Sequence, residues 1–329
     1  MKKIFFSILL VGLTFWVGLA VISAYEIQDL TGVEEKGDFV LGPGKTELWL
    51  DPGEKTTGQL LITNRLGRTM DFKISIEDFK GSRDPAETTI LLGEEKGPYS
   101  LKDYLHPEIT EFTLKHGQRM VLPVEISIPK DAEPGGLYGS VLISTSPPRA
   151  ELEVEKEMAR GQMQLISRLG CLYFIRVKGE VIEDGFLKEL KMKEAVKKFY
   201  EKGPISFELF FENNGNVHLN PYGGIEIYNL LGKKIDEIEV EPYFAMPDSL
   251  RLREVKWQKG LLFGRYTALA SINRGYGDII DQKSINFWVI PWKIILAGLV
   301  GLYLIIWFFK WIVSHLEIRK KTPSGSSKI

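Results

Sequence analysis

The sequence predicts an all-β fold in which two immunoglobulin-like β-sandwich domains in tandem precede one carboxyl-terminal transmembrane helix. Short runs of alternating apolar and polar residues, separated by turn residues, extend over residues 39–287. Amphipathic helical periodicity is missing between these runs, so an antiparallel sandwich is favoured over an α/β fold. The uncharged apolar run at residues 294–309 makes roughly 24 Å of helix, close to the ~30 Å thickness of a bilayer core.

The composition bounds the size and the partners of the protein. With 44% hydrophobic content in 329 residues, the chain has enough apolar material for two domains of ordinary size. The formal net charge of -1 argues against a nucleic-acid partner, because such proteins usually carry a basic surplus or stripe. Cys171 is the only cysteine, which excludes an internal disulfide and is typical of proteins on the outside of many bacteria. Cys171 is either a small buried hydrophobic residue, which we favour, or a reactive thiol.

Residues 1–24 have the pattern of a signal peptide. Lys2 and Lys3 precede a long apolar run, and small residues lead to a cleavage site after Ala24. The length of the run, and Ile22 at position −3, leave an uncleaved anchor as the alternative. In both cases the middle of the chain is exported. A linker is expected over residues 25–38.

The first sandwich domain is predicted over residues 39–179. Phe72, Ile74 and Ile76 share one face of a strand, and the residues between them are polar. Residues 124–128 repeat this alternation, and Asp-Pro-Gly at residues 51–53 forms a turn between two earlier strands. At least seven strand-like runs at short spacing indicate a sandwich of immunoglobulin type.

Two long segments interrupt this first domain. The charged residues 147–162 are either a hairpin excursion between the last two strands, which we favour, or a partner-binding arm. Residues 81–107 are predicted to form a second long loop, and loops of this length are often functional.

The second sandwich domain is predicted over residues 180–287. Phe207, Leu209 and Phe211 lie on one side of a strand and are expected in the core. A hairpin is expected to turn at Gly232. Its second strand alternates apolar residues with an acidic row, which we interpret as a solvated face or edge protection rather than a metal site. The acidic row consists of Glu237, Glu239 and Glu241.

A transmembrane helix is predicted over residues 288–313. Trp292 and Lys293 precede its apolar centre, and Lys310 and Trp311 follow it, so these four residues are the predicted membrane-anchor flanks. The tail, residues 314–329, is basic, and the positive-inside rule places it in the cytoplasm. We therefore predict a single-pass plasma-membrane protein with both sandwiches extracellular and the lipid bilayer as a partner.

The sequence contains no recognisable reaction centre. The histidines His106, His116, His218 and His315 are far apart and form no HExxH motif or i,i+4 pair. Gly-Pro-Gly-Lys-Thr at residues 42–46 lacks the first glycine of a phosphate-binding loop and is interpreted as a turn before a strand, and no GxSxG elbow occurs. We therefore expect no catalytic residue, no cofactor and no metal, and the sequence assigns no binding residue.

The densest polar cluster is Asn-Asn-Gly-Asn at residues 213–216. Asparagine bonds its own backbone and tolerates positive φ, so we favour a tight turn between strands. The alternative is a carbohydrate or calcium site at a loop tip, although the local charge is low for calcium.

Several short motifs in the first domain carry a resemblance to a known family. They are the turn at residues 50–54, the strand end at 62–64, residues 126–129 leading to 133–138, and Arg-Leu-Gly at 168–170. Together with the order of signal, two β domains, membrane helix and basic tail, they resemble the WxL-interacting protein family of bacterial cell-surface proteins. The resemblance implies a peptidoglycan-binding first domain and a second domain that attaches to host or partner proteins. Similar sandwiches also occur in pilus chaperones, which are soluble.

These observations lead to one main hypothesis and two alternatives. The main hypothesis is a non-catalytic, membrane-anchored cell-surface protein that binds cell-wall glycan, a secreted or surface protein, or both. The first alternative is a chaperone-like scaffold or assembly subunit that donates a strand to a secreted partner or accepts one from it. The second alternative is an unrecognised surface hydrolase, which turnover of ester, peptide or glycoside substrates would reveal.

Overall fold

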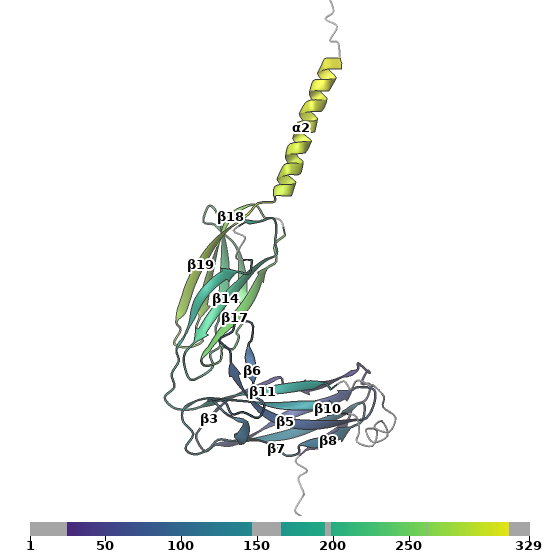
Figure 1. The fold of residues 1–329 in the computed structure, drawn as a ribbon, viewed down its shortest axis with the longest axis vertical. Helices are drawn as coiled ribbons and strands as arrows, with labels where there is room; N and C mark the ends of the chain where they lie inside the picture. Colours follow the sequence, from purple (N-terminus) through teal and green to yellow (C-terminus); the bar gives the residue numbers. More distant parts are fainter. Residues whose placement is uncertain (1–24, 147–165, 195–198, 261, 316–329) are drawn as a thin grey trace, which may run out of the picture.

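The computed structural model describes residues 25–146, 166–194, 199–260 and 262–315, which form two β-sandwiches followed by one helix (Figure 1). This architecture confirms the predicted fold class. The strands of the first sandwich, domain 1, run across the view in Figure 1, and those of the second, domain 2, run upwards, so the two domains form an L. The predicted signal peptide with its cleavage site at Ala24, residues 147–162 and nearly all of the tail lie outside the described residues.

The first sheet of domain 1 is antiparallel throughout. Its strands are β1 (Glu26–Asp29), β2 (Asp38–Gly42), β4 (Lys55–Arg65), β7 (Leu105–Pro107) and β9 (Gln118–Ser127). They have the order β1-β9-β4-β2, with β7 also paired to β9. Because β1 pairs with β9 from Glu26 to Asp29, the expected linker at residues 25–38 begins with a strand of the sandwich.

The second sheet of domain 1 packs against the first. Its strands are β3 (Lys45–Leu50), β5 (Met70–Gly81), β6 (Thr89–Leu91), β8 (Glu111–Leu114), β10 (Gly135–Ser146) and β11 (Arg168–Val177). They have the order β3-β11-β10-β5-β6, with β8 also paired to β5, and only the β3–β11 pair is parallel among these described strands.

Residues 81–107 are not the single long loop that we predicted. They contain β6, a 3-10 helix η1 (Lys102–Tyr104) and β7. The physical reason is burial, because Leu101 and Leu105 on either side of η1 are inserted into the core of domain 1. The segment therefore packs against the domain instead of leaving it.

β2 and β3 belong to different sheets although they are almost consecutive in the sequence. Pro43 lies between them and has no N–H group, so the hydrogen-bond ladder of β2 cannot continue through it. The chain crosses to the second sheet, where β3 runs parallel to β11. Gly-Pro-Gly-Lys-Thr at residues 42–46 is therefore a crossing between two sheets that leads into a strand.

The core of domain 1 follows the predicted alternation. Phe72 and Ile74 are buried, and the ring of Phe72 stacks on that of Phe112 with centroids 5.2 Å apart. Cys171 is also buried, with its Sγ 3.7 Å from Thr46 Oγ1. Burial raises the pKa of the Cys171 thiol, which disfavours the reactive thiolate. Cys171 thus packs as a small hydrophobic residue.

Domain 2 has a three-stranded and a five-stranded sheet. The first consists of β12 (Gly185–Met192), β14 (Ile205–Asn213) and β17 (Ser249–Trp257), in the order β12-β14-β17. The second consists of β13 (Phe199–Tyr200), β15 (Tyr222–Asn229), β16 (Lys234–Val240), β18 (Gly264–Asn273) and β19 (Ile280–Val289). Its order is β13-β19-β18-β15-β16.

Domain 2 also matches its predicted pattern. Phe207, Leu209 and Phe211 are fully buried between the sheets. The β15–β16 hairpin turns at Gly232, whose φ of 75° is a conformation that favours glycine. Glu237 and Glu239 of β16, and Glu241 just after it, are exposed, as expected for a solvated face.

The helix α2 (Trp292–His315) has 24 residues and is long and apolar enough to cross a membrane. It begins after the predicted start at residue 288 because β19 still pairs with β18 at Val289. Trp292 and Lys293 are its first residues, and Lys310 and Trp311 lie in its last two turns. In Figure 1 it leaves from the end of domain 2 farthest from domain 1.

The register of β14 predicts losses of stability of very different size for two adjacent phenylalanines. Phe211→Ala should lower the unfolding free energy by about 3–5 kcal/mol, because it empties a fully buried site. Phe210→Ala should cost less than about 1 kcal/mol, because Phe210 lies on the other face and is partly exposed under Lys191. Urea denaturation of both variants measures the difference, and equal losses would contradict this register.

Candidate functional site

The two domains meet at an apolar surface on the outer face of the second sheet of domain 1. Phe79, Tyr138 and Phe174, from β5, β10 and β11, are buried there against Met246 of domain 2. The ring centroids of Phe174 and Phe244 of domain 2 are 5.1 Å apart. Outward-facing residues of a surface sheet are normally polar, so this aromatic face requires a cover. Domain 2 supplies the cover, and we call this contact the joint.

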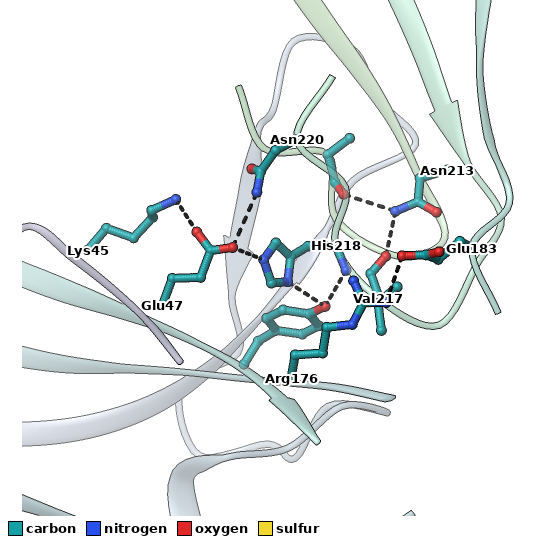
Figure 2. A network of polar contacts seen from close by, with 10 residues as sticks. Lys45, Glu47, Arg176, Glu183, Asn213, Val217, His218 and Asn220 are labelled. Atoms are coloured by element: carbon teal, nitrogen blue, oxygen red, sulfur yellow. Dashed lines mark hydrogen bonds and ion pairs between the residues drawn. The ribbon is translucent and has the colours of Figure 1, made fainter. Parts of the chain in front are cut away.

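A partly buried polar network crosses the joint at one side (Figure 2). The side chain of His218, in domain 2, places its Nε2 2.8 Å from Oε1 of Glu47 on β3. The backbone N–H of His218 donates to Tyr138 Oη at 2.6 Å, and its Nδ1 lies 3.3 Å from the same oxygen. Asn220 Nδ2 also donates to Glu47 Oε1, at 3.2 Å, and Lys45 Nζ donates to Oε2 at 2.7 Å. Every polar atom named here thus has a partner across or beside the joint.

The charges in this network favour an ionised glutamate and a neutral tyrosine. The hydrogen bond from His218, helped by Lys45, lowers the pKa of Glu47 to about 2, although partial burial opposes the shift. Burial raises the pKa of Tyr138 above its ordinary value. The two His218 contacts fit a ring whose Nε2–H donates to Glu47 and whose Nδ1 accepts from the Tyr138 hydroxyl.

The order Glu47, His218, Tyr138 resembles an acid–base relay, but its position argues against catalysis. Tyr138 is fully buried, so its hydroxyl cannot meet a substrate. The Tyr138 oxygen also accepts a hydrogen bond from the backbone N–H of His218. This hydrogen bond would have to break before the oxygen could act as a nucleophile. The network is better explained as a lock that satisfies the polar atoms inside the joint and orients the domains.

Further contacts secure the joint around its rim. The Gly136 N–H donates to Asn216 O at 2.9 Å, and the Leu250 N–H donates to Ser82 O at 3.0 Å. Gly81, at the end of β5, lies so close to domain 2 that an added Cβ would be 2.5 Å from Ser249 Cβ. Ion pairs at the same rim join Arg176 to Glu183 at 2.6 Å and Arg83 to Glu212 at 3.2 Å.

The asparagine cluster at residues 213–216 forms part of this joint. Asn213 is buried and its Nδ2 donates to the carbonyls of Val217 and Ala245. Its Oδ1 accepts the Gly215 N–H, as in the tight turn that we favoured. The Asn216 Oδ1 accepts the Ile182 N–H. Because these groups bond protein atoms, they offer little to a carbohydrate or a cation.

The other residues singled out from the sequence do not converge. His106, His116 and His315 lie apart from the joint, and only His218 belongs to it. Within the described ranges, no group of three His, Cys, Asp or Glu side chains is arranged to hold a metal ion. Sequence reasoning missed Glu47, and it placed Tyr138 only within the motif at residues 133–138 and not at a contact between domains. The available signal was the aromatic character of the outward positions of β10 and β11.

Domain 1 also has an open strand edge beside the first residues of β11. β3 pairs with Leu172 to Val177, so in the part of the chain that the structure describes, no strand lies beside residues 168–171 on that side. The Leu172 N–H donates to Gly44 O, so by alternation the N–H groups of Gly170 and Arg168 point toward the same edge. Leu169 is 41% exposed there.

An open cavity lies at the same end of domain 1. It has a volume of about 470 Å³ and is lined by Phe72 and Phe112 together with the polar residues Asp71, Lys73, Glu111 and Thr113. Ser146, the last residue of β10, also borders it. Because Ser144 pairs with Arg168, the cavity is at the same end of the sheet as the start of β11, with β10 and β11 between it and the open edge. A strand edge that has no neighbouring strand, as here among the described residues, is a common site of strand addition.

No family model and no curated protein sequence matches this chain. Among solved structures it is similar to the class 5 fimbriae chaperone CfaA, with 12% identity and a TM-score of 0.35, over 77% of this chain and 100% of that chain. It is similar to the E. coli chaperone DraB, with 14% identity and a TM-score of 0.32, over 76% of this chain and 96% of that chain. It is also similar to PapD-like domain 7 of human CEP192, with 12% identity and a TM-score of 0.28, over 43% of this chain and 86% of that chain. Scores and identities this low say nothing about what this chain binds.

The ionised Glu47 predicts a loss of stability in acid. Its pKa of about 2 in the folded protein lies below its ordinary value of 4.5, so its contribution is complete above pH 4.5 and is lost as the pH falls toward 2. Glu47→Gln should unfold at lower urea than the unchanged protein at neutral pH, and the two midpoints should converge on acidification. The exposed Glu239→Gln is the matched control. A difference between the two urea midpoints that stays constant with pH would show that Glu47 is not held in the ionised form by the joint.

Proposed function

We propose that this chain is a non-catalytic, single-pass membrane protein whose domain 1 binds a partner protein by β-strand addition at the open edge of β11. The observation that carries this proposal is the β3-side edge of residues 168–171 of β11, where no strand lies among the described residues and where Leu169 is exposed. A strand from a partner would complete the sheet through main-chain hydrogen bonds. The proposal follows the scaffold alternative more closely than the glycan hypothesis.

The side chains at this edge suit an apolar partner strand. Leu169 lies on the same face of β11 as the buried Cys171, so it points toward the interior of the sandwich. It is nevertheless exposed, because the core ends before it. Alternate side chains of an added strand would cover Leu169 at this end of the core. Such alternation would give the contact its specificity.

Membrane anchoring completes the proposal. α2 has the length and composition of a membrane span, and its tryptophans and lysines suit the two interfaces. The basic tail supports an orientation with both domains outside the plasma membrane. The joint would then present domain 1 away from the bilayer, with its open edge accessible to a secreted or surface protein.

Cell-wall glycan remains a second candidate ligand through the resemblance of domain 1 to WxL-interacting proteins. Sedimentation of the full chain in detergent with purified peptidoglycan tests it. Salt-resistant retention would favour glycan binding, and its absence would leave strand addition as the better explanation of domain 1.

Strand addition predicts a site-specific crosslink. Leu169→p-benzoylphenylalanine in the full chain, expressed in its own cells, should give one dominant protein adduct on illumination. The same substitution at Lys283, on the exposed part of β19, should give none.

A matched pair of variants separates the backbone from the side chain. Arg168→Pro removes an N–H that points to the open edge, and should lower the adduct yield about tenfold if that group makes one main-chain bond of about 1–1.5 kcal/mol. Arg168→Ala keeps the N–H and should retain most of the yield. Equal yields from the two variants, or equal adducts from positions 169 and 283, would refute strand addition here.

A further inference from the structure

The strand register of domain 2 gathers several loops at the end from which α2 leaves. Asn229, the last residue of β15, pairs with Tyr266 near the start of β18. Arg265 pairs with Trp288 near the end of β19, and Phe199 of β13 pairs with the same tryptophan. The β15–β16, β17–β18 and β13–β14 loops therefore share one end of the sandwich with the start of α2. We call it the loop end of domain 2, and in Figure 1 it is the end beside α2.

This loop end exposes large apolar side chains. Leu231 is 89% exposed and Phe263 is 70% exposed. Leu230 and Phe199 are also exposed. Several large apolar residues at one end of a domain are uncommon on a surface that faces only water, and they usually mark an interaction site.

The exposed residues are held outward by defined contacts. At the β15–β16 turn, Asn229 Oδ1 accepts the N–H groups of Leu231 and Lys233, each at 3.0 Å. In the β17–β18 loop, the Tyr266 hydroxyl accepts the Phe263 N–H at 3.2 Å and donates to the Phe263 carbonyl at 3.1 Å. The turn and the loop are thus shaped so that leucine and phenylalanine side chains point away from the core.

The connection to α2 keeps this end near the membrane surface. β19 ends at Val289 and α2 begins at Trp292, so almost no linker separates the sandwich from the helix. Lys293, in the first turn of α2, forms a 3.0 Å ion pair with Glu201 in the β13–β14 loop. The loop end therefore lies at the level where α2 enters the bilayer.

We propose that the loop end of domain 2 docks into the headgroup region of the bilayer that α2 crosses, with Phe199, Leu230, Leu231 and Phe263 as the inserted residues. This inference rests on the proposed membrane anchoring. Aromatic and leucine side chains with nearby cations are the composition of interfacial membrane-binding surfaces. Cationic side chains are present in all three loops, at Lys202, Lys233 and Lys259. Docking would fix the angle of the sandwich on the membrane, and the joint would carry that angle to domain 1.

Fluorescence quenching in lipid vesicles tests the docking. The full chain is reconstituted with an environment-sensitive label on Leu231→Cys, on Lys283→Cys, or on Leu299→Cys inside α2. Cys171 is buried, and the chain without an added cysteine measures its background. Lipids brominated near the top of the acyl chains should quench position 231 at least twofold more than position 283. Aqueous iodide should show the opposite order.

The label in α2 separates this proposal from the anchoring on which it rests. If Leu299→Cys is quenched by lipid while position 231 is quenched only by iodide, the anchor stands and docking is wrong. Shielding of position 231 from both quenchers would mean that protein covers the loop end, which also overturns docking. If Leu299→Cys is not quenched by lipid, the proposed anchoring fails instead.

A triple variant provides an independent readout. A label on Lys202→Cys reports the loop end without occupying an inserted position. Leu230→Ser, Leu231→Ser and Phe263→Ser together should abolish its quenching by brominated lipid. The replaced side chains are exposed, so the urea midpoint should stay unchanged and exclude misfolding. Undiminished quenching in this variant would contradict the proposal.

Discussion

The cover that domain 2 provides for the outer face of β5, β10 and β11 is the contact on which the rest of the arrangement depends. Phe79, Tyr138 and Phe174 turn that face apolar, and exposing three aromatic side chains to water would be unfavourable. Aromatic packing alone is not directional. The partly buried network of Glu47 and His218 supplies direction, because each polar atom inside the joint needs its partner in one geometry.

A fixed joint gives the two ends of the molecule separate tasks. The loop end of domain 2 stays beside α2, and domain 1 extends sideways from the opposite end of domain 2 (Figure 1). The open edge of β11 is consequently held away from the proposed membrane surface. If the joint were loose, neither the proposed docking of domain 2 nor the anchoring of α2 would determine where that edge points. Rigidity at the joint therefore links the membrane to the proposed partner site.

Local patterns in the sequence predicted much of the fold, while contacts between distant segments were harder to foresee. Period-two alternation placed Phe207 and Phe211 in the core, and a glycine between two strand-like runs placed a hairpin turn at Gly232. Both features depend on residues that are neighbours in the chain. Burial of Leu101 in segment 81–107 depends on a sheet formed elsewhere. The Glu47–His218 pair joins residues of different domains, and no spacing rule encodes such a pair. The edge of β11 likewise became visible only when the strand order was known.

The distribution of distances between the two domains tests the joint most directly. Spin labels on Lys55→Cys of domain 1 and Lys283→Cys of domain 2, both exposed, can be placed in the full chain in detergent. Pulsed electron paramagnetic resonance should then give one narrow distance, and Tyr138→Phe combined with His218→Ala should broaden it. A broad distribution in the unchanged protein would show that the domains move independently and would contradict the joint as the organising contact.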